Sequence, residues 1–430
     1  MPKITFIGAG SVVFSKNLLM DILSYPELGD SEIALMDINK ERLDLIYALA
    51  KKVIEKINCG AKVTATLNRR EALDSADYVI NMIQVGGLEM FEKDCEIPRK
   101  YGIDQTVGDT IGPGGVFRGL RTIPVLLDIA KDMEELCPDA LFINYSNPMA
   151  INCWAMNKAT KIKNVGLCHS VQGTAYQLAT YVGVDPSAVS YWVAGINHMS
   201  WFLEFKLGKE DLYPKLWKAM EDPEIYMKDA VRFEIMKYFD YFVTESTHHM
   251  SEYVSYFRRN PERIKELIPE RWDYLEICKN GWQPHYEMIK KEISGEKPIV
   301  IERSREYASD IIYSMETGIP TRINGNVNNS GLITNLPKDC CVEVPCLVDK
   351  TGIHPCFVGD LPAQCAALNR TNINLQELAV MAALDKDPHK AFQAVALDPL
   401  TSSILEPRDI KRMVDELFEA EKDWIGFSIS

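Results

Sequence analysis

Residues 3–11, Lys-Ile-Thr-Phe-Ile-Gly-Ala-Gly-Ser, decide the fold of this 430-residue chain. The apolar run that ends at Ile7 predicts a buried strand, and Phe14–Leu23 has helical spacing. Between them, Gly8, Gly10 and Ser11 form a tight turn at which the backbone can approach a pyrophosphate at the helix N-terminus. The stretch therefore predicts the dinucleotide-binding turn of a Rossmann fold.

A carboxylate at the end of the next predicted strand strengthens this interpretation. Asp37 follows the strand Glu32–Met36 and can accept hydrogen bonds from the ribose hydroxyls of an adenosine. Because it would repel a 2′-phosphate, NAD is favoured over NADP. Val13 stands where the usual fingerprint has its third glycine, so a plain glycine turn with a helix-capping aspartate is the alternative.

Strands and helices alternate through the first 150 residues, which indicates a doubly wound parallel sheet of the α/β class covered on both faces. After about residue 195 the pattern changes to long helices with irregular loops. We therefore expect an NAD-binding Rossmann domain at 1–195 and an α+β substrate or catalytic domain at 196–430. The expected strands are 3–7, 32–36, 62–66, 78–84, 140–145, 163–167, 191–194 and 340–347, and 325–331 is expected to be a turn-rich loop.

Composition excludes several classes of protein. The formal net charge of −14 opposes nucleic-acid binding and a polybasic membrane anchor, and no apolar run reaches the 18 residues of a spanning helix. The eleven cysteines contain no CxxC pair, which favours buried reduced thiols. The apolar stretch 2–7 runs into glycines without a cleavage pattern, so we expect no signal peptide and a cytoplasmic location.

Polar residues cluster where predicted strands end. Gln84 and Gly86 follow one strand, and Asn144 and Asn147 follow another, at the rim where open α/β sheets bind ligands. We expect Gln84 and Asn144 to contact the cofactor, with ordinary turns as the alternative.

Two further strand ends carry possible metal ligands. Cys168 and His198 stand thirty residues apart, and a thiolate with an imidazole can bind a divalent transition metal. On spacing alone, a buried thiol and a hydrogen-bonded histidine are the better explanation of the pair.

Five motifs occur together in an order that resembles glycoside hydrolase family 4. They are Gly8-Ala-Gly-Ser, Gly108-Asp109-Thr-Ile-Gly112-Pro-Gly-Gly115, Asn144-Tyr-Ser-Asn147-Pro-Met, Cys168-His-Ser-Val and Gly195-Ile-Asn-His198. The similarity extends to Asn335-Leu-Pro, Val342-Glu-Val and Thr371-Asn-Ile-Asn, and so covers nearly the whole chain. Cys-His-Ser-Val resembles the version found in the α-galactosidases of the family. The resemblance implies a fold like that of lactate and malate dehydrogenases.

The resemblance also implies an unusual hydrolysis. Family 4 enzymes depart from the two-carboxylate scheme of most glycosidases. NAD⁺ would oxidise C3 of the galactose ring, and a divalent metal, manganese in much of the family, would polarise the ketone. A base would then remove the C2 proton, the aglycone would leave by elimination, water would add, and NADH would return its hydride.

Several site residues follow from the resemblance. Cys168 and His198 match the metal ligands, Asn147 matches a contact to a substrate hydroxyl, and His169 takes the position of the proposed acid. Asp109 matches an acidic position near the sugar.

The base that takes the C2 proton is harder to assign. Related enzymes use a tyrosine of the second domain, and Tyr253 is favoured here over His249 and Glu245. A tyrosine has a pKa near 10, so positive charge nearby would have to lower it. The alternative is a charge-rich helix end without catalytic function. Arg305 is expected to contact substrate, with a surface ion pair as its alternative.

Three other functions compete with the α-galactosidase interpretation. An α-glucuronidase or α-galacturonidase would share the family, a lactate/malate-type dehydrogenase would share only the Rossmann domain, and an NAD-sensing regulatory protein would lack catalysis. A dehydrogenase does not need Cys168 with His198, which favours the hydrolase. The family resemblance also implies a homo-oligomer, either a dimer or a tetramer.

Overall fold

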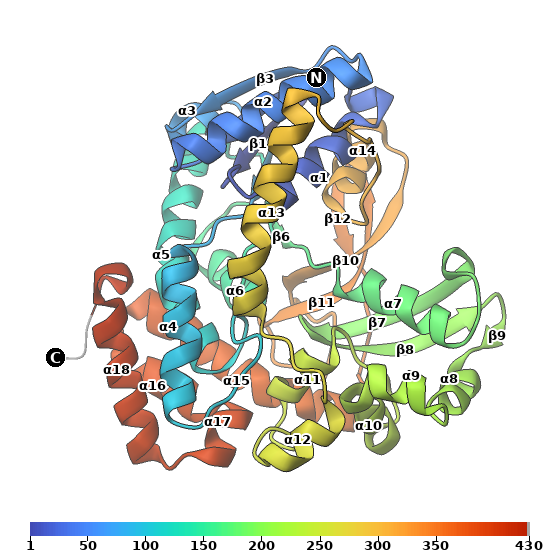
Figure 1. The fold of residues 1–430 in the computed structure, drawn as a ribbon, viewed down its shortest axis with the longest axis vertical. Coiled ribbons are helices and arrows are strands. Elements are labelled where there is room, and N and C mark those ends of the chain that lie inside the picture. Colours follow the sequence, from blue (N-terminus) through green and yellow to red (C-terminus); the bar gives the residue numbers. More distant parts are fainter. Residues whose placement is uncertain (428–430) are drawn as a thin grey trace.

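The computed structural model describes residues 1–427, and a single twelve-stranded sheet runs through it (Figure 1). The strand order is β3-β2-β1-β4-β5-β6-β10-β11-β7-β8-β9, with β12 paired to β11. The strands are β1 (Lys3–Ile7), β2 (Glu32–Met36), β3 (Lys62–Thr66), β4 (Tyr78–Asn81), β5 (Leu141–Asn144), β6 (Asn164–Gly166), β7 (Val189–Ile196), β8 (Met199–Leu207), β9 (Glu210–Asp211), β10 (Thr321–Asn328), β11 (Cys341–Asp349) and β12 (Gly352–Pro355).

The first six strands are parallel and confirm the predicted fold class. Their order 3-2-1-4-5-6 is that of a Rossmann sheet, and it reverses between β1 and β4. Strands β1, β4 and β5 are almost wholly buried, as expected for a sheet with helices on both faces. The reversal places the ends of β1 and β4 at the crevice where such sheets bind ligands.

Helices cover both parts of this sheet. In the first half they are α1 (Val12–Leu23), α2 (Lys40–Ile57), α3 (Arg69–Leu73), α4 (Gly87–Lys100), α5 (Gly112–Leu136), α6 (Met149–Ala159) and α7 (Ser170–Tyr181). In the second half they are α8 (Tyr213–Ala219), α9 (Pro223–Lys228), α10 (Ala230–Phe239), α11 (Thr247–Tyr253), α12 (Pro261–Leu267), α13 (Tyr274–Ser294), α14 (Ala308–Thr317), α15 (Ala363–Asp385), α16 (Pro388–Ala396), α17 (Pro399–Ile404) and α18 (Pro407–Ile425).

The two halves are interleaved. Helix α13 packs on α1, α2 and α4, and α14 packs on α1, so second-half helices cover the outside of the Rossmann sheet (Figure 1). The sheet itself continues from β6 into β10, and therefore connects residues before and after 195. The boundary proposed at residue 195 stays a prediction.

The prediction of a turn-rich loop at 325–331 was wrong, because Thr321–Asn328 forms the central strand β10. Its asparagine side chains bond to two other strands: Asn324 Nδ2 donates to the carbonyl of Val193 on β7 at 3.0 Å, and Asn326 Nδ2 donates to that of Gly166 on the adjacent β6 at 3.2 Å. Gly325 provides close packing, since a Cβ there would lie 3.0 Å from Val165. Polar residues that usually mark turns are here buried inside the sheet.

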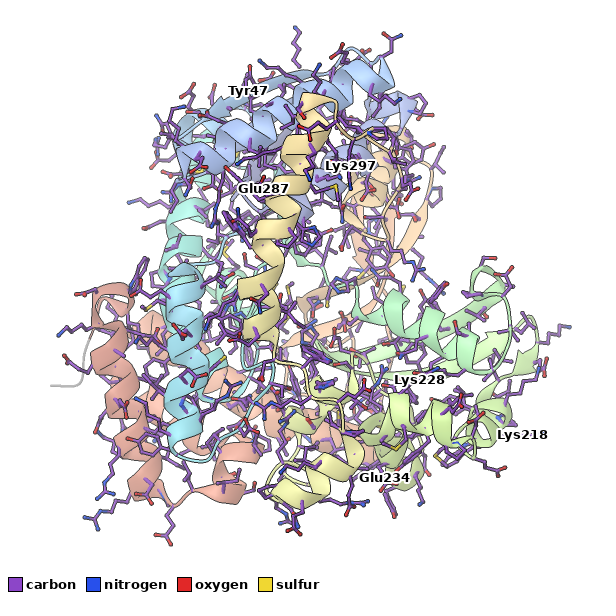
Figure 2. The ribbon with its side chains drawn as sticks, viewed as in Figure 1. Tyr47, Lys218, Lys228, Glu234, Glu287 and Lys297 are labelled. Carbon is purple, nitrogen blue, oxygen red and sulfur yellow. The ribbon has the colours of Figure 1, made fainter. Side chains whose placement is uncertain are left out.

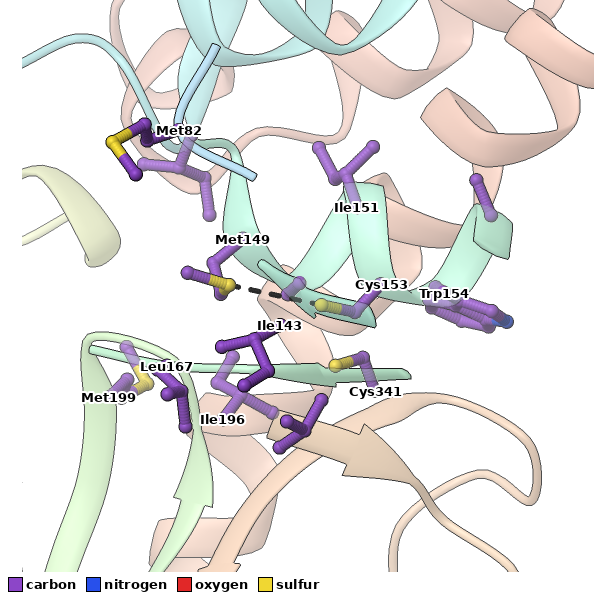
Figure 3. Packing of buried hydrophobic residues seen from close by; sticks show 14 of the residues in the cluster. Met82, Ile143, Met149, Ile151, Cys153, Trp154, Leu167, Ile196, Met199 and Cys341 are labelled. Carbon is purple, nitrogen blue, oxygen red and sulfur yellow. Dashed lines mark hydrogen bonds between the residues drawn. The ribbon is translucent and has the colours of Figure 1, made fainter. Parts of the chain in front are cut away.

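An apolar cluster lies where the parallel and antiparallel strands meet (Figure 3). Figure 3 shows Met149 and Cys153 of α6 facing Ile143, Leu167, Ile196, Met199 and Cys341. Leu167 directly precedes Cys168, while Ile196 and Met199 flank the Asn197-His198 turn. Close packing at these positions therefore fixes the backbone beneath both predicted metal ligands.

Many charged side chains lie on the outside of the molecule, among them Lys218 on α8, Lys228 on α9 and Glu287 on α13 (Figure 2). None of the helices between residues 1 and 427 combines the length and apolar character that a membrane span requires. All eleven cysteines are free thiols, and most of them are buried.

The C-terminal helix is attached through a buried ion cluster. Arg121 of α5, fully buried, contacts Asp94 of α4 at 2.8 and 2.5 Å and Glu421 of α18 at 2.8 Å. Burial with Asp94 nearby raises the pKa of Glu421 well above its usual range.

We expect Arg121→Met to reduce the free energy of unfolding by about 3–5 kcal/mol, because it leaves two buried carboxyl groups without their cation. Urea unfolding followed by circular dichroism measures this. Arg412→Met, which removes an exposed pair with Asp409 on α18, is the control and should cost less than about 1 kcal/mol. Equal losses in the two variants would contradict the structural importance of the cluster.

Candidate active site

The glycine turn after β1 is tight and closely packed. Gly8 has a φ of +84°, and a Cβ there would lie 3.0 Å from the backbone of Ile83. The carboxylate of Asp37 accepts the backbone N–H of Gly10 at 2.7 Å and that of Asn39 at 2.8 Å. Asp37 thus holds the turn, while Asn39 caps α2, so the helix-capping alternative for Asp37 does not apply. Ser11 begins α1 with its hydroxyl not used as a cap.

The two other predicted cofactor contacts differ in accessibility. Gln84 is exposed in the loop after β4, and its amide donates to the carbonyl of Gly87 at 3.1 Å. Asn144 is buried, accepts from Asn81 Nδ2 at 2.9 Å and donates to the carbonyl of Ser146 at 2.9 Å. Its side chain is therefore used to tie the ends of β4 and β5 together.

Cys168 and His198 lie side by side. Cys168 follows β6, and His198, with a φ of +63°, lies in the two-residue turn between β7 and β8. The Cys168 sulfur is 3.3 Å from His198 Nε2. Two atoms bound to one cation at about 2.3 and 2.1 Å stand roughly 3.1–3.6 Å apart, so the pair fits a shared transition metal.

The protonation state of His198 also suits metal binding. Burial, with His249 close by, lowers the pKa of His198 to about 3, so the imidazole is neutral and keeps a lone pair. His198 Nδ1 is buried without a hydrogen-bond partner. Over residues 1–427 no group of three or more His, Cys, Asp or Glu side chains is placed to hold a metal ion, so Cys168 and His198 form a pair without a third ligand of these four types.

Asp109 and Asn147 form a polar group in contact with each other. Asn147 Nδ2 donates to Asp109 Oδ2 at 3.0 Å, and Arg118 Nη1 lies 3.5 Å from the same oxygen. Burial raises the pKa of Asp109 despite the opposing charges of Arg118 and His249. The pair brings a buried carboxyl and an amide together beside α5.

Helix α11 places two of the candidate bases, His249 and Tyr253, near the Cys168–His198 pair. The His249 ring is 4.6 Å from the His198 ring, edge to face, and His249 Nδ1 pairs with the carboxylate of Glu245. Burial lowers the pKa of His249, but Glu245 raises it more, so the net shift is upward.

Tyr253 of the same helix lies further away. Its ring is 6.3 Å from that of His198 and 2% exposed. Burial raises the pKa of Tyr253 well above 10, and the carboxylates of Asp109, Glu252 and Glu245 add to this rise. The neighbouring side chains therefore do not supply the positive charge that a tyrosine base needs.

His169 and Arg305 lie at the outer rim, next to α7. His169 has a 58% exposed side chain and its Nδ1 is 3.5 Å from Glu306, which raises the pKa of the imidazole. Arg305 stacks over Tyr176 at 3.8 Å instead of forming the ion pair that was its alternative. Glu306 is a residue that sequence reasoning missed.

Comparisons with known proteins agree with these motifs. Residues 3–184 match the family 4 glycosyl hydrolases, and residues 193–401 match the C-terminal domain of that family. The chain is 47% identical to an α-galactosidase of Bacillus subtilis over 99% of both chains. It is 40% identical to an α-galactosidase of Rhizobium meliloti over 98% of this chain and 89% of that one.

This chain belongs to glycosyl hydrolase family 4.

A solved family 4 structure shares the fold. A 6-phospho-α-glucosidase from gut microorganisms, in complex with NAD and Mn²⁺, superposes with a TM-score of 0.84 and covers 100% of both chains. The sequence identity is 21%, so the likeness concerns the fold alone. Family membership removes the simple dehydrogenase and the non-enzymatic NAD sensor as descriptions of this chain.

Glu252 of this family 4 chain positions the loop before Asp109, and sequence reasoning did not assign it a role. Its buried carboxylate accepts the backbone N–H groups of Thr106 at 2.6 Å, Val107 at 2.9 Å and Gly108 at 3.1 Å. The sequence signal for Glu252 was its position between His249 and Tyr253, two candidates for the C2 base. Only the fold shows that it faces the loop.

Glu343 is a third carboxylate to which sequence reasoning assigned no role. It is 0% exposed on β11, and burial raises its pKa to about 7 although Ser200 and Asn326 hydrogen-bond to it. A glutamate inside the apolar strand Cys341–Asp349 was the sequence signal.

Glu343 should make the metal-free protein less stable as the pH rises from about 4.5 to 7. The folded protein holds a proton that the unfolded chain, with a carboxyl pKa of 4.5, has already released, so this contribution is complete below 4.5 and lost above 7. In Glu343→Gln the free energy of unfolding should decrease over this pH range by about 3 kcal/mol less than in the parent protein. Urea unfolding at a series of pH values tests this, and identical pH profiles would contradict it.

Proposed function

We propose that this chain is an α-galactosidase that depends on NAD and a divalent transition metal such as Mn²⁺. The observation that carries the substrate assignment is the 47% identity, over nearly the full length, to a relative named α-galactosidase. Gly8, Gly10, Ser11 and Asp37 would hold the dinucleotide. Cys168 and His198, 3.3 Å apart, would hold the cation.

NAD bound here supplies a hydride acceptor and donor for C3 of the sugar, and the cation supplies a Lewis acid. The chain itself has to orient the sugar and move two protons. Asn147, whose amide lies 3.0 Å from Asp109, is placed to contact a sugar hydroxyl together with that carboxyl. Asp109 is buried and Asn147 is half-buried, which limits the competition from water for these hydrogen bonds.

We assign removal of the C2 proton to His249, with Tyr253 as the alternative. Glu245 binds His249 Nδ1 and raises the pKa of the imidazole, so its deprotonated form is the stronger base at Nε2, and the carboxylate stabilises the imidazolium that results. A base oriented by a carboxylate in this way is a common catalytic arrangement. Burial, together with the carboxylates of Asp109, Glu252 and Glu245, raises the pKa of Tyr253 and favours its protonated hydroxyl.

We assign protonation of the departing glycosidic oxygen to His169. Glu306 raises the pKa of this imidazole, so a larger fraction carries the proton near neutral pH. Its exposed place at the rim fits a group that meets the aglycone. Arg305 lies on the same rim, stacked on the Tyr176 ring, and would contact the substrate from there.

The thiol ligand also bears on localisation. Cys168 binds a metal only while reduced, and eleven free thiols suit a reducing compartment, which supports a cytoplasmic location. A homo-oligomer, either a dimer or a tetramer, stays a prediction from the family.

Release of nitrophenol from p-nitrophenyl α-galactoside should require NAD⁺, Mn²⁺ and a thiol reductant together, without accumulation of NADH. In D₂O the released galactose should carry deuterium at C2, because the C2 proton exchanges with solvent. Absorbance and NMR measure the two effects. Galactose that carries only protium at C2 would exclude the elimination mechanism. Turnover of the α-galacturonide but not of the α-galactoside would exclude the α-galactosidase assignment.

Cys168→Ser should lower Mn²⁺ affinity and turnover by about 100-fold or more, since a hydroxyl is a poor substitute for a thiolate ligand. NADH binding, followed by fluorescence, should change little. Cys59→Ser, which alters a half-buried thiol next to α2, is the matched control and should behave like the parent protein. Normal Mn²⁺ binding by Cys168→Ser would overturn the ligand assignment.

A further inference from the structure

A fully buried carboxyl group lies between the two strands that carry the proposed metal ligands. Glu343 pairs in register with Asn326 of β10 on one side and with Gly195 of β7 on the other. Strand β10 in turn pairs with β6, which leads to Cys168, and β7 leads to the turn that carries His198. Glu343 therefore occupies the junction between the two ligand-bearing segments.

One oxygen of Glu343 is connected to the His198 turn. Glu343 Oε2 is 2.8 Å from the hydroxyl of Ser200, and this hydroxyl is 2.9 Å from the carbonyl of Ile196. Ile196 and Ser200 lie two residues before and two residues after His198. The Ser200 hydroxyl thus links the two ends of the turn, and Glu343 is hydrogen-bonded to that hydroxyl.

The other oxygen is connected to the strand before Cys168. Asn326 Nδ2 donates to Glu343 Oε1 at 3.3 Å and to the carbonyl of Gly166 at 3.2 Å. Gly166 is the last residue of β6, two residues before Cys168. One amide group therefore joins Glu343 to the backbone that presents the thiol.

We propose that Glu343 is a positioning residue that sets the separation of Cys168 and His198 and thereby the affinity of the site for a divalent cation. This inference rests on the metal site proposed above. Glu343 makes no hydrogen bond to either ligand, so it acts through Ser200 and Asn326. Groups that orient metal ligands in this way typically contribute 10–100-fold in affinity.

The hydrogen-bond pattern indicates which substitution preserves the function. The Ser200 hydroxyl has one proton, and its two neighbours are the Ile196 carbonyl and Glu343. Both contacts are satisfied when Ser200 donates to Ile196 and a neutral carboxyl group donates to Ser200. Glutamine reproduces this pattern, because its amide donates to Ser200 and its carbonyl accepts from Asn326. Alanine loses both connections.

The experiment measures Mn²⁺ binding to the full chain in the presence of NAD⁺, by the electron paramagnetic resonance signal of free Mn²⁺. Glu343→Ala should lower the affinity at least tenfold, and Glu343→Gln should stay within about threefold of the parent protein. NADH binding should change little in both variants. Asp398→Ala is the matched control, since Asp398 is equally buried but caps α17 through Thr401.

Ser200→Ala breaks the same connection from the other side and serves if Glu343→Ala does not fold. It should lower Mn²⁺ affinity about fivefold, the value of one hydrogen bond. Unchanged Mn²⁺ affinity in folded Glu343→Ala or Ser200→Ala would overturn the proposal. Equal losses of Mn²⁺ and NADH binding, matched by Asp398→Ala, would also overturn it, because they would reflect a general loss of structure.

Cys168→Ser, measured in parallel, separates this inference from the proposed function. Parent-like Mn²⁺ binding by Cys168→Ser would remove the metal site itself. Loss of binding in Cys168→Ser together with parent-like binding in Glu343→Ala would leave the site in place and remove only the role of Glu343.

Discussion

The close approach of β6 and β10 at Gly166 and Asn326 is the contact on which the geometry of the site depends. It is where the parallel Rossmann strands join the antiparallel strands, and it brings the end of β6 toward the β7–β8 turn. The approach requires glycine: a Cβ at Gly166 would lie 2.4 Å from the sulfur of Met149 and 2.6 Å from that of Cys153. The apolar cluster of Figure 3 surrounds this junction, so packing and strand pairing act together on Cys168 and His198.

Charge balance is the second constraint, because the site holds several buried ionisable groups in a protein with a net charge of −14. Each is neutralised in a different way. Glu245 pairs with His249, Asp109 has Asn147 and Arg118 nearby, and burial raises the pKa of Glu343 to about 7. Uncompensated charges at this depth would be costly, so the pairs that position the catalytic candidates also keep the site stable.

The parallel sheet was predictable because its signals are local. The strands at 3–7, 32–36 and 62–66 were predicted with the bounds that the structure has, and in the first two an apolar run between turn residues specifies the strand directly. Strand β10 was not predicted, because Asn-rich sequence usually marks turns and only the carbonyls of Val193 and Gly166 explain its amides. Likewise Gly112 and the glycines after it begin the long helix α5, where composition alone indicates a loop.

Contiguous residues determined by themselves the glycine turn after β1, the motif order that identifies the family, and the identity of the candidate ligands. These depend on local backbone geometry and side-chain chemistry, which a sequence states directly. Only the tertiary structure decided that Cys168 meets His198, that His249 is paired with Glu245 while burial and nearby carboxylates raise the pKa of Tyr253, and that Glu343 lies between the strands that lead to the two ligands. These relations depend on strand pairing between segments as far apart as Gly166 and Asn326, 160 residues along the chain, and on burial that only the folded core creates.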